Sequence, residues 1–246
     1  MYVKVRLAAV VATLFAALGA TSVAAAPALA GEAVHATPTL NNWVVEGSLT
    51  AKKLNQKVTL PEGSTFNGRG DIELEFIPST GKTRIEGTLT GNVAVPPFST
   101  MLTLPVGGIP TPVSVGMTFT QVGPAPGKVL GAPGQCLETE AFPAGCISLS
   151  VPTKVNVGFT LVGILGIEVP THCETSQPVN FNLKEVQTLV EVLVTGPHFV
   201  GTATIPSIKC DGLEGLTLAP VMTTALSGPG NPYELKIHHP PLPPLE

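Results

Sequence analysis

Short runs of alternating apolar and polar residues, separated by glycine and proline, constrain the fold of this chain more than any other feature. The 246 residues include 26 Gly and 25 Pro, which interrupt long helices and favour turns. In an alternating run, successive side chains point to opposite faces of a sheet, so one face can be buried while the other meets water. From Asn42 onward, the pattern predicts an all-β fold: a β-sandwich or open barrel of short antiparallel strands.

The clearest alternation predicts a hairpin. Asp71, Glu73 and Glu75 share one face of a run whose other face is apolar. A Pro-Ser-Thr-Gly turn follows, and Lys82 and Arg84 then share a face of the next run. We expect the acids to lie across from the two cations on a solvated face. A catalytic carboxylate pair is the alternative, but acids on one face of an amphipathic strand are normally solvated.

Two segments recur in related form. Residues 45–50 (VEGSLT) resemble residues 85–90 (IEGTLT), and residues 113–119 (VSVGMTF) resemble residues 155–161 (VNVGFTL). The chain is too short for propeller blades of four strands at this spacing. Repeated hairpin units in one or two packed sheets are the favoured interpretation, and chance similarity of such strands stays open.

One short helix is expected near the C-terminus, at Leu218–Leu226, with Thr217 as its cap and the Ser-Gly-Pro-Gly sequence after it as its stop. Residues 183–194 fit a helix by the spacing of their apolar residues, but their valines favour a strand, and we predict a strand. A last strand is predicted at Tyr233–His238.

The N-terminus resembles a secretory signal peptide. Lys4 and Arg6 precede an apolar stretch, and small residues then offer cleavage after Ala26 or Ala30. We predict a signal peptide of residues 1–30, because Pro27 would follow the first site. An uncleaved anchor is the alternative, but the stretch is short for the ~20 residues that span a bilayer. The mature chain offers no transmembrane segment, so we expect a secreted protein, extracellular or associated with the cell envelope.

The mature chain divides at a loop. Residues 122–134 contain three prolines and four glycines, which predict a loop or linker between a β half at 31–123 and a second at 135–239. The two halves can equally form one continuous domain. Residues 240–246 form a proline-rich tail expected to be polyproline-like.

All four cysteines follow the signal region. In an oxidising compartment an even count indicates disulfides, here two, with three possible connectivities. We predict Cys136–Cys146, across a loop that turns easily, and Cys173–Cys210. A metal site is disfavoured because there is no C-x-x-C and because His172 beside Cys173 is a poor chelating pair.

Charge and motifs exclude several functions. Removing Lys4 and Arg6 takes the formal net charge from −4 to about −6, which disfavours binding to nucleic acid. The chain has no G-x-S-x-G, no H-E-x-x-H and no complete phosphate-binding loop. We therefore predict no catalytic, cofactor-binding or metal-binding residues, and a protein that is not an enzyme.

A resemblance adds to this interpretation. Residues 201–206 (GTATIP), then Cys210, then residues 226–231 (LSGPGN) resemble the C-terminal part of a group of secreted actinobacterial proteins of unknown function, and residues 104–105 and 113–123 fit the same group. The resemblance implies an exported β protein, envelope-associated or extracellular, of a high-GC Gram-positive bacterium. It transfers no activity and no site residues.

Three functions remain open. Residues 159–167 (FTLVGILGI) are apolar on both faces, and such a strand must meet a core on each side, or a core and a ligand. This favours a module that binds an apolar small molecule or lipid, although both faces can simply meet protein. A structural or adhesive cell-wall protein is the second hypothesis, and an enzyme of unrecognised type is the third.

The loop between Cys136 and Cys146 is a candidate binding loop. Glu138, Glu140 and Phe142 would lie on a rigid, disulfide-closed platform, where binding residues often occur. The alternative is that Phe142 plugs the sheet edge while both glutamates are merely solvated.

Overall fold

A computed structural model describes residues 33–77, 82–132, 146–161 and 172–240. These residues form one antiparallel sheet of 14 strands and two helices, which confirms the predicted all-β fold. The strands are β1 (Val34–Ala36), β2 (Thr39–Ala51), β3 (Gln56–Thr59), β4 (Thr65–Ile77), β5 (Lys82–Ala94), β6 (Phe98–Val106), β7 (Ile109–Gln121), β8 (Ala125–Ala132), β9 (Cys146–Leu161), β10 (His172–Thr175), β11 (Val179–Thr188), β12 (His198–Ile205), β13 (Ile208–Cys210) and β14 (Gly228–His238). The helices are α2 (Leu189–Val194) and α3 (Gly212–Leu226).

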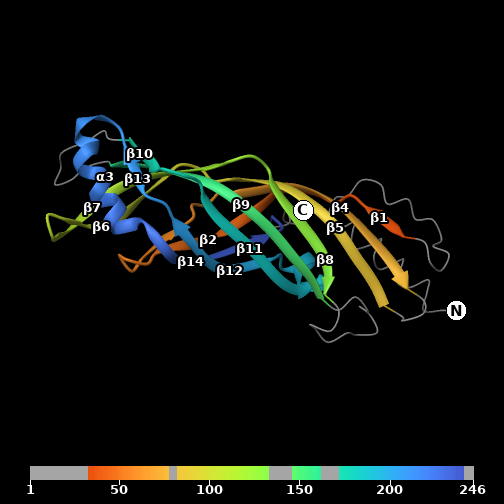
Figure 1. Cartoon of the computed structure of the whole chain (residues 1–246). Coiled ribbons are helices and arrows are strands. Elements are labelled where there is room, and N and C mark those ends of the chain that lie inside the picture. Colours follow the sequence, from red (N-terminus) through yellow and green to blue (C-terminus); the bar gives the residue numbers. More distant parts are fainter. Residues whose placement is uncertain (1–32, 78–81, 133–145, 162–171, 241–246) are drawn as a thin grey trace, which may run out of the picture.

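The sheet curls into an elongated open barrel (Figure 1). Neighbouring strands follow the order β12-β14-β2-β4-β5-β8-β9. The long strand β9 then pairs with β11 along one half, and with β7 and β10 along the other. β11 lies beside β12, so the two ends of this order come together around a common core. α3 lies at the end formed by β6, β7, β10 and β13, whereas β1, β4 and β5 extend to the other end (Figure 1).

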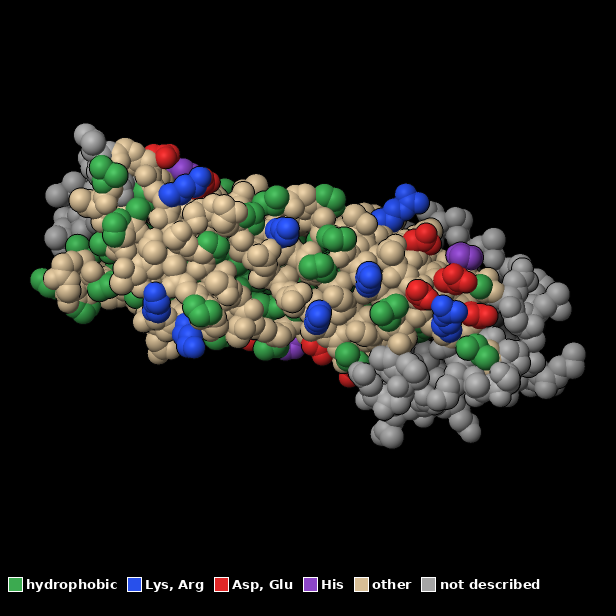
Figure 2. All heavy atoms as spheres, in the orientation of Figure 1, with side chains coloured by type: hydrophobic (Ala, Val, Ile, Leu, Met, Phe, Trp, Pro, Cys, Tyr) green, Lys and Arg blue, Asp and Glu red, His purple; other side chains and the backbone are tan. Residues whose placement is uncertain are grey.

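The predicted hairpin is formed by β4 and β5, with Glu75 directly opposite Arg84, but Lys82 lies opposite Ile77 and not opposite an acid as predicted. The Arg84 guanidinium lies 3.8 Å from the Glu75 carboxylate and 2.7 Å from that of Glu86. These side chains are exposed, and charged residues gather over this part of the surface (Figure 2). The acids therefore form a solvated face. The predicted turn lies outside the described residues.

The recurring segments lie in one sheet. β2 and β5, which carry the first pair of similar sequences, are separated by β4. β7 and β9, which carry the second pair, hydrogen-bond directly to each other, with Val115 opposite Leu161 and Phe119 opposite Val157. Only the second pair of similar sequences is therefore adjacent in the sheet.

The loop predicted at 122–134 is wrong for most of its length, because β8 runs through it and pairs with both β5 and β9. Its inward positions are Ala125, Gly127 and Val129, and all three are buried. A Cβ on Gly127 would lie only 3.0 Å from the Cβ of Leu89 on β5. Small residues are required for this close approach, and they conceal the alternation that marks a strand in the sequence.

The strand predicted over residues 183–194 is half wrong. β11 ends at Thr188, and α2 begins at the next residue. The Thr188 hydroxyl accepts a hydrogen bond from the Glu191 N–H at 3.2 Å, and the Glu191 carboxylate accepts one from the Thr188 N–H at 3.0 Å. This reciprocal capping box ends the strand, although the valines that follow prefer β structure.

Thr188→Ala should lower the free energy of unfolding by about 1 kcal/mol, because it removes the cap of α2. The hydrogen bonds from the Thr188 backbone and hydroxyl hold the pKa of Glu191 below its ordinary value of 4.5. Their stabilising effect is therefore present above pH 4.5 and lost as the pH falls through the lowered folded-state pKa. Urea unfolding across this acid range should show a smaller acid-dependent loss in T188A than in the wild type. Identical pH profiles would contradict this role of the cap.

The predicted C-terminal helix is present and ends at Leu226, but it begins at Gly212, six residues before the predicted start. Its N-cap is Asp211 and not Thr217, and Pro220 lies inside it. Gly212 takes a φ of +77°, which lets the chain turn sharply from β13 into the helix. β14 likewise begins at Gly228, earlier than the predicted Tyr233.

A disulfide joins Cys173 on β10 to Cys210 on β13, as predicted. The two residues are directly opposite each other in the antiparallel pair, and Cys173 is fully buried. The bond fixes β13, and with it the start of α3, to the end of the sheet. The other predicted bond, Cys136–Cys146, involves a residue outside the described part of the chain.

Asn231, at the end of the segment that carries the family resemblance, is buried and links three parts of the fold. Its amide nitrogen donates to the carbonyls of Gly228 at 2.7 Å and Ala203 at 3.4 Å, and its amide oxygen accepts from the Lys52 N–H at 2.9 Å. In the same segment, the Ser227 hydroxyl donates to the Pro206 carbonyl at 2.6 Å. These residues hold β12, β14 and the turn after β2 together.

Candidate ligand-binding cavity

The apolar core of the barrel is not completely filled. It contains a cavity of about 120 Å³ and a second of about 70 Å³. Both are lined by Val93, Thr153, Leu183 and Ile237, so the two cavities adjoin along the barrel. Together they form an elongated apolar space inside the sheet.

The wall of the larger cavity is drawn from nearly every strand around the barrel and from α2. Trp43, Phe66 and Phe199 supply its aromatic surface, and Thr153 adds a hydroxyl. The remaining lining residues are Pro38, Leu40, Ile72, Leu74, Ile85, Leu89, Val93, Val129, Ile147, Leu149, Val151, Leu183, Val192, Pro197 and Ile237. Because alternate residues of each strand point inward, residues far apart in the sequence meet on this surface.

Glycines on β4 and β5 create the room for Phe66. A Cβ on Gly91 would overlap the end of the Phe66 ring, and one on Gly68 would lie 2.7 Å from its Cε1. The ring therefore lies flat across the backbone of its own strand and of its neighbour. This placement makes it part of the cavity wall and keeps it from filling the space between the strands.

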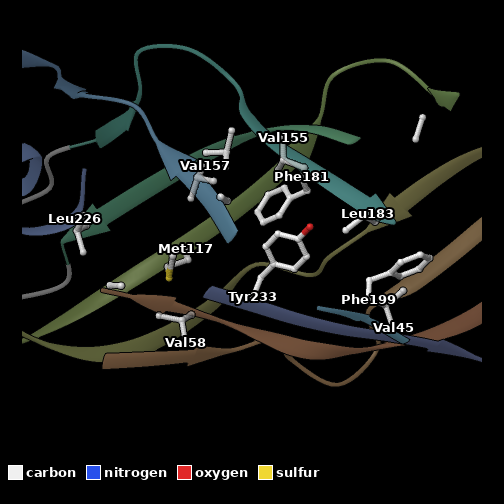
Figure 3. Packing of buried hydrophobic residues seen from close by; sticks show 14 of the residues in the cluster. Val45, Val58, Met117, Val155, Val157, Phe181, Leu183, Phe199, Leu226 and Tyr233 are labelled. Carbon is white, nitrogen blue, oxygen red and sulfur yellow. The ribbon is translucent and has the colours of Figure 1, made fainter. Parts of the chain in front are cut away.

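Tyr233 and Phe181 stand at the smaller cavity (Figure 3). Their rings meet edge to face with centroids 5.3 Å apart. The Tyr233 hydroxyl donates to the Asn182 carbonyl on β11 at 3.0 Å, so the side chain crosses the interior from β14. Burial raises the pKa of this hydroxyl. Its cross-strand neighbour is Gly201, where a Cβ would collide with the Tyr233 ring.

Two of the polar side chains that line the cavities, those of Gln121 and Thr153, make hydrogen bonds to the protein itself. The Gln121 amide accepts from the Val93 N–H at 2.6 Å and donates to the Gly91 and Gly123 carbonyls at 3.0 and 2.8 Å. The Thr153 hydroxyl donates to the Val151 carbonyl at 3.3 Å. The space is therefore suited to hydrocarbon, because an apolar cavity of this size stays dry and can accept small apolar molecules.

The predicted binding-loop residues Glu138, Glu140 and Phe142 are outside the described residues. Glu73 and Glu75 are on the β4–β5 surface, away from the apolar lining. Of the doubly apolar run at 159–167, the described part ends β9, where Phe159 is buried.

Residues 33–77, 82–132, 146–161 and 172–240 contain neither a metal-binding cluster nor a membrane-spanning helix. Within those ranges, no group of His, Cys, Asp or Glu side chains is arranged to hold a metal ion. Neither described helix is long and apolar enough to cross a membrane.

Comparison with known protein families, with characterised proteins and with solved structures gives no match to this chain.

Proposed function

We propose that this protein is an exported carrier that holds the hydrocarbon part of an apolar ligand inside its barrel. The observation that carries the proposal is the elongated cavity, with its walls of aromatic and aliphatic side chains. Binding pockets for small molecules are concave, mostly apolar and largely formed in advance. Export is supported by the signal-like N-terminus, and the Cys173–Cys210 disulfide is compatible with it.

The free-energy cost of unfilled volume in the core supports the presence of a ligand. Unfilled core volume costs about 24 cal/mol per Å³, so cavities of about 120 and 70 Å³ together correspond to roughly 4–5 kcal/mol. An apolar molecule in this space restores the missing dispersion contacts and offsets that cost. A fold selected only for rigidity would gain from larger side chains at these positions.

Trp43 provides a direct test, because it is the single tryptophan of the chain and lines the larger cavity. Titration with benzene should change its fluorescence in a saturable way, as expected for a small molecule that enters a dry apolar cavity. Isothermal calorimetry of the same titration should give the same midpoint. A response that rises linearly without saturation, together with no calorimetric binding, would contradict the proposal.

Val93→Phe should weaken benzene binding at least tenfold, because Val93 lies where the two cavities adjoin and a ring there occupies the space. Val200→Phe is the matched control, since Val200 is 64% exposed on β12 and the same change there leaves the interior untouched. Equal affinities in V93F and V200F would show that benzene binds elsewhere. Thermal melts of both variants report whether either fold is disturbed.

A further inference from the structure

Gln187, one residue before the end of β11, has an unpaired polar atom in its side chain. Its amide oxygen is buried, and it has no hydrogen-bond partner among the described residues. Buried polar atoms are almost always paired, and leaving one unpaired is costly because it has lost its water. The unpaired oxygen is an acceptor, so what it lacks is a hydrogen-bond donor.

The alternation of buried and exposed residues along β11 places Gln187 on the inward face of the strand. Along β11, Val179, Phe181 and Leu183 are buried, whereas Lys184 and Val186 are exposed. The inward face of the strand therefore continues through Glu185 and Gln187, two residues and four residues beyond Leu183.

The pairing of β11 with β9 also places Gln187 next to the larger cavity. Glu185 is directly opposite Leu149 on β9, and Gln187 is directly opposite Ile147. Both β9 residues line the larger cavity. Opposed residues of an antiparallel pair project from the same face with their Cβ atoms about 5 Å apart. The Gln187 amide is thus beside the cavity wall, on the side toward α2.

The charge at this end of the cavity is negative. Glu185 is half-buried, and its carboxylate makes no hydrogen bond or ion pair with the described residues. Lys184 points to the outer face, and α2 carries Glu191 with no basic residue in its last turn. An anionic group that entered here would meet a carboxylate and an acceptor oxygen, both of which disfavour it.

We infer that the natural ligand is an amphiphile with an uncharged head that donates a hydrogen bond, such as a hydroxyl or an amide, and that this head meets Gln187. The inference rests on the proposed function, because the apolar chain of the same molecule occupies the cavity. A fatty acid is the disfavoured alternative, since its carboxylate at neutral pH has no donor and faces Glu185. The Gln187 oxygen and the Glu185 charge together select the head group.

Dodecanol and dodecanoate test this selection, because they share one chain and differ only in the head. At neutral pH we expect dodecanol to bind the wild type at least tenfold more tightly, measured by Trp43 fluorescence and by calorimetry. Gln187→Met keeps the length of the side chain and removes the acceptor. It should weaken dodecanol by about threefold to tenfold, as expected for the loss of one hydrogen bond, and this loss should exceed any change in the affinity for benzene, which has no head group.

Two further measurements distinguish head-group selection from a general loss of stability. Glu185→Gln should tighten dodecanoate severalfold and so reduce the preference of the protein for dodecanol over dodecanoate. Q187M should melt at or above the wild-type temperature, because it removes an unpaired buried group. A lower melting temperature would show that Gln187 has a partner within the fold, and would overturn the assignment.

Failure of the proposed cavity function and failure of the head-group selection give different results. If benzene, dodecanol and dodecanoate all fail to bind, the proposed cavity function is wrong, and this inference falls with it. If benzene binds but dodecanol and dodecanoate bind equally, or if Q187M binds dodecanol as the wild type does, the cavity function stands and the head-group selection is wrong.

Discussion

Gly196→Ala should lower the free energy of unfolding by at least ~3 kcal/mol, one of the two largest effects we expect from a single substitution. Gly196 lies between α2 and β12 with a φ of +78°, a conformation that costs a residue with a Cβ about 1–2 kcal/mol. In addition, its Cβ would overlap the carbonyl oxygen of Ile237 on β14. That backbone cannot move freely, because the Ile237 N–H donates to the Pro197 carbonyl at 3.0 Å. The clash therefore adds to the conformational cost.

Gly212→Ala is the matched control. Gly212 has nearly the same φ, +77°, but a Cβ there would meet nothing within 4 Å. We expect it to cost about 1 kcal/mol, the conformational part alone. Urea unfolding of the two variants therefore separates strain from collision. Equal losses in G196A and G212A would mean that the close contact of Gly196 with β14 is not present in solution.

Phe199→Ala should lower the free energy of unfolding by about 3–5 kcal/mol, because it truncates a large, fully buried side chain. Phe199 is only 1% exposed and forms part of the wall of the larger cavity (Figure 3). The truncation also enlarges that cavity, so F199A should bind aromatic molecules larger than benzene more tightly than the wild type does. Thermal unfolding and calorimetry measure the two effects separately.

Phe119→Ala is the comparison for this prediction. Phe119 is only partly buried and stacks against Phe98, with ring centroids 5.9 Å apart, near the other end of the barrel. It should cost less than F199A and should leave the larger cavity unchanged. If F119A proves the more destabilising of the two, the core is not centred where the described packing places it.

Strands with clear alternation could be predicted from the sequence, because their pattern is local. The β4–β5 hairpin is the best example, with the pairing of Glu75 and Arg84 expected from residue order alone. The cysteine count predicted disulfides but left three connectivities open, of which the chosen one included Cys173–Cys210. The end of α3 followed from the glycines and proline after it. For the hairpin and for the end of α3, a short stretch of sequence is sufficient to decide the structure.

Elements that depend on contacts between distant strands could not be predicted in this way. β8 looked like a loop because of its small residues and its proline, and the need for Gly127 is explained only by the close approach of β5. The switch from β11 to α2 depends on a single reciprocal cap at Thr188, which outweighs the β preference of the valines around it. Local propensity is a weak guide where one such interaction decides.

The cavity itself had no signal in the sequence. Inward-facing residues can be identified by alternation, but whether side chains as far apart as Trp43, Val129 and Phe199 fill the space between them depends on the curvature of the whole sheet. For Gln187, unlike the cavity, the sequence did contain a signal. Polar residues at 185 and 187 continue the inward positions of a strand whose earlier inward residues are apolar, and such a break in the pattern marks a place where function overrides packing.

Native mass spectrometry of the protein purified from its own host, without detergent or organic solvent, tests the central claim most directly. Our account expects the intact chain to carry a small apolar molecule that organic extraction removes, and expects V93F to carry less of it than V200F does. A wild-type protein that shows only the mass of its own polypeptide, together with an extract free of lipid, would contradict the claim that the barrel carries a ligand.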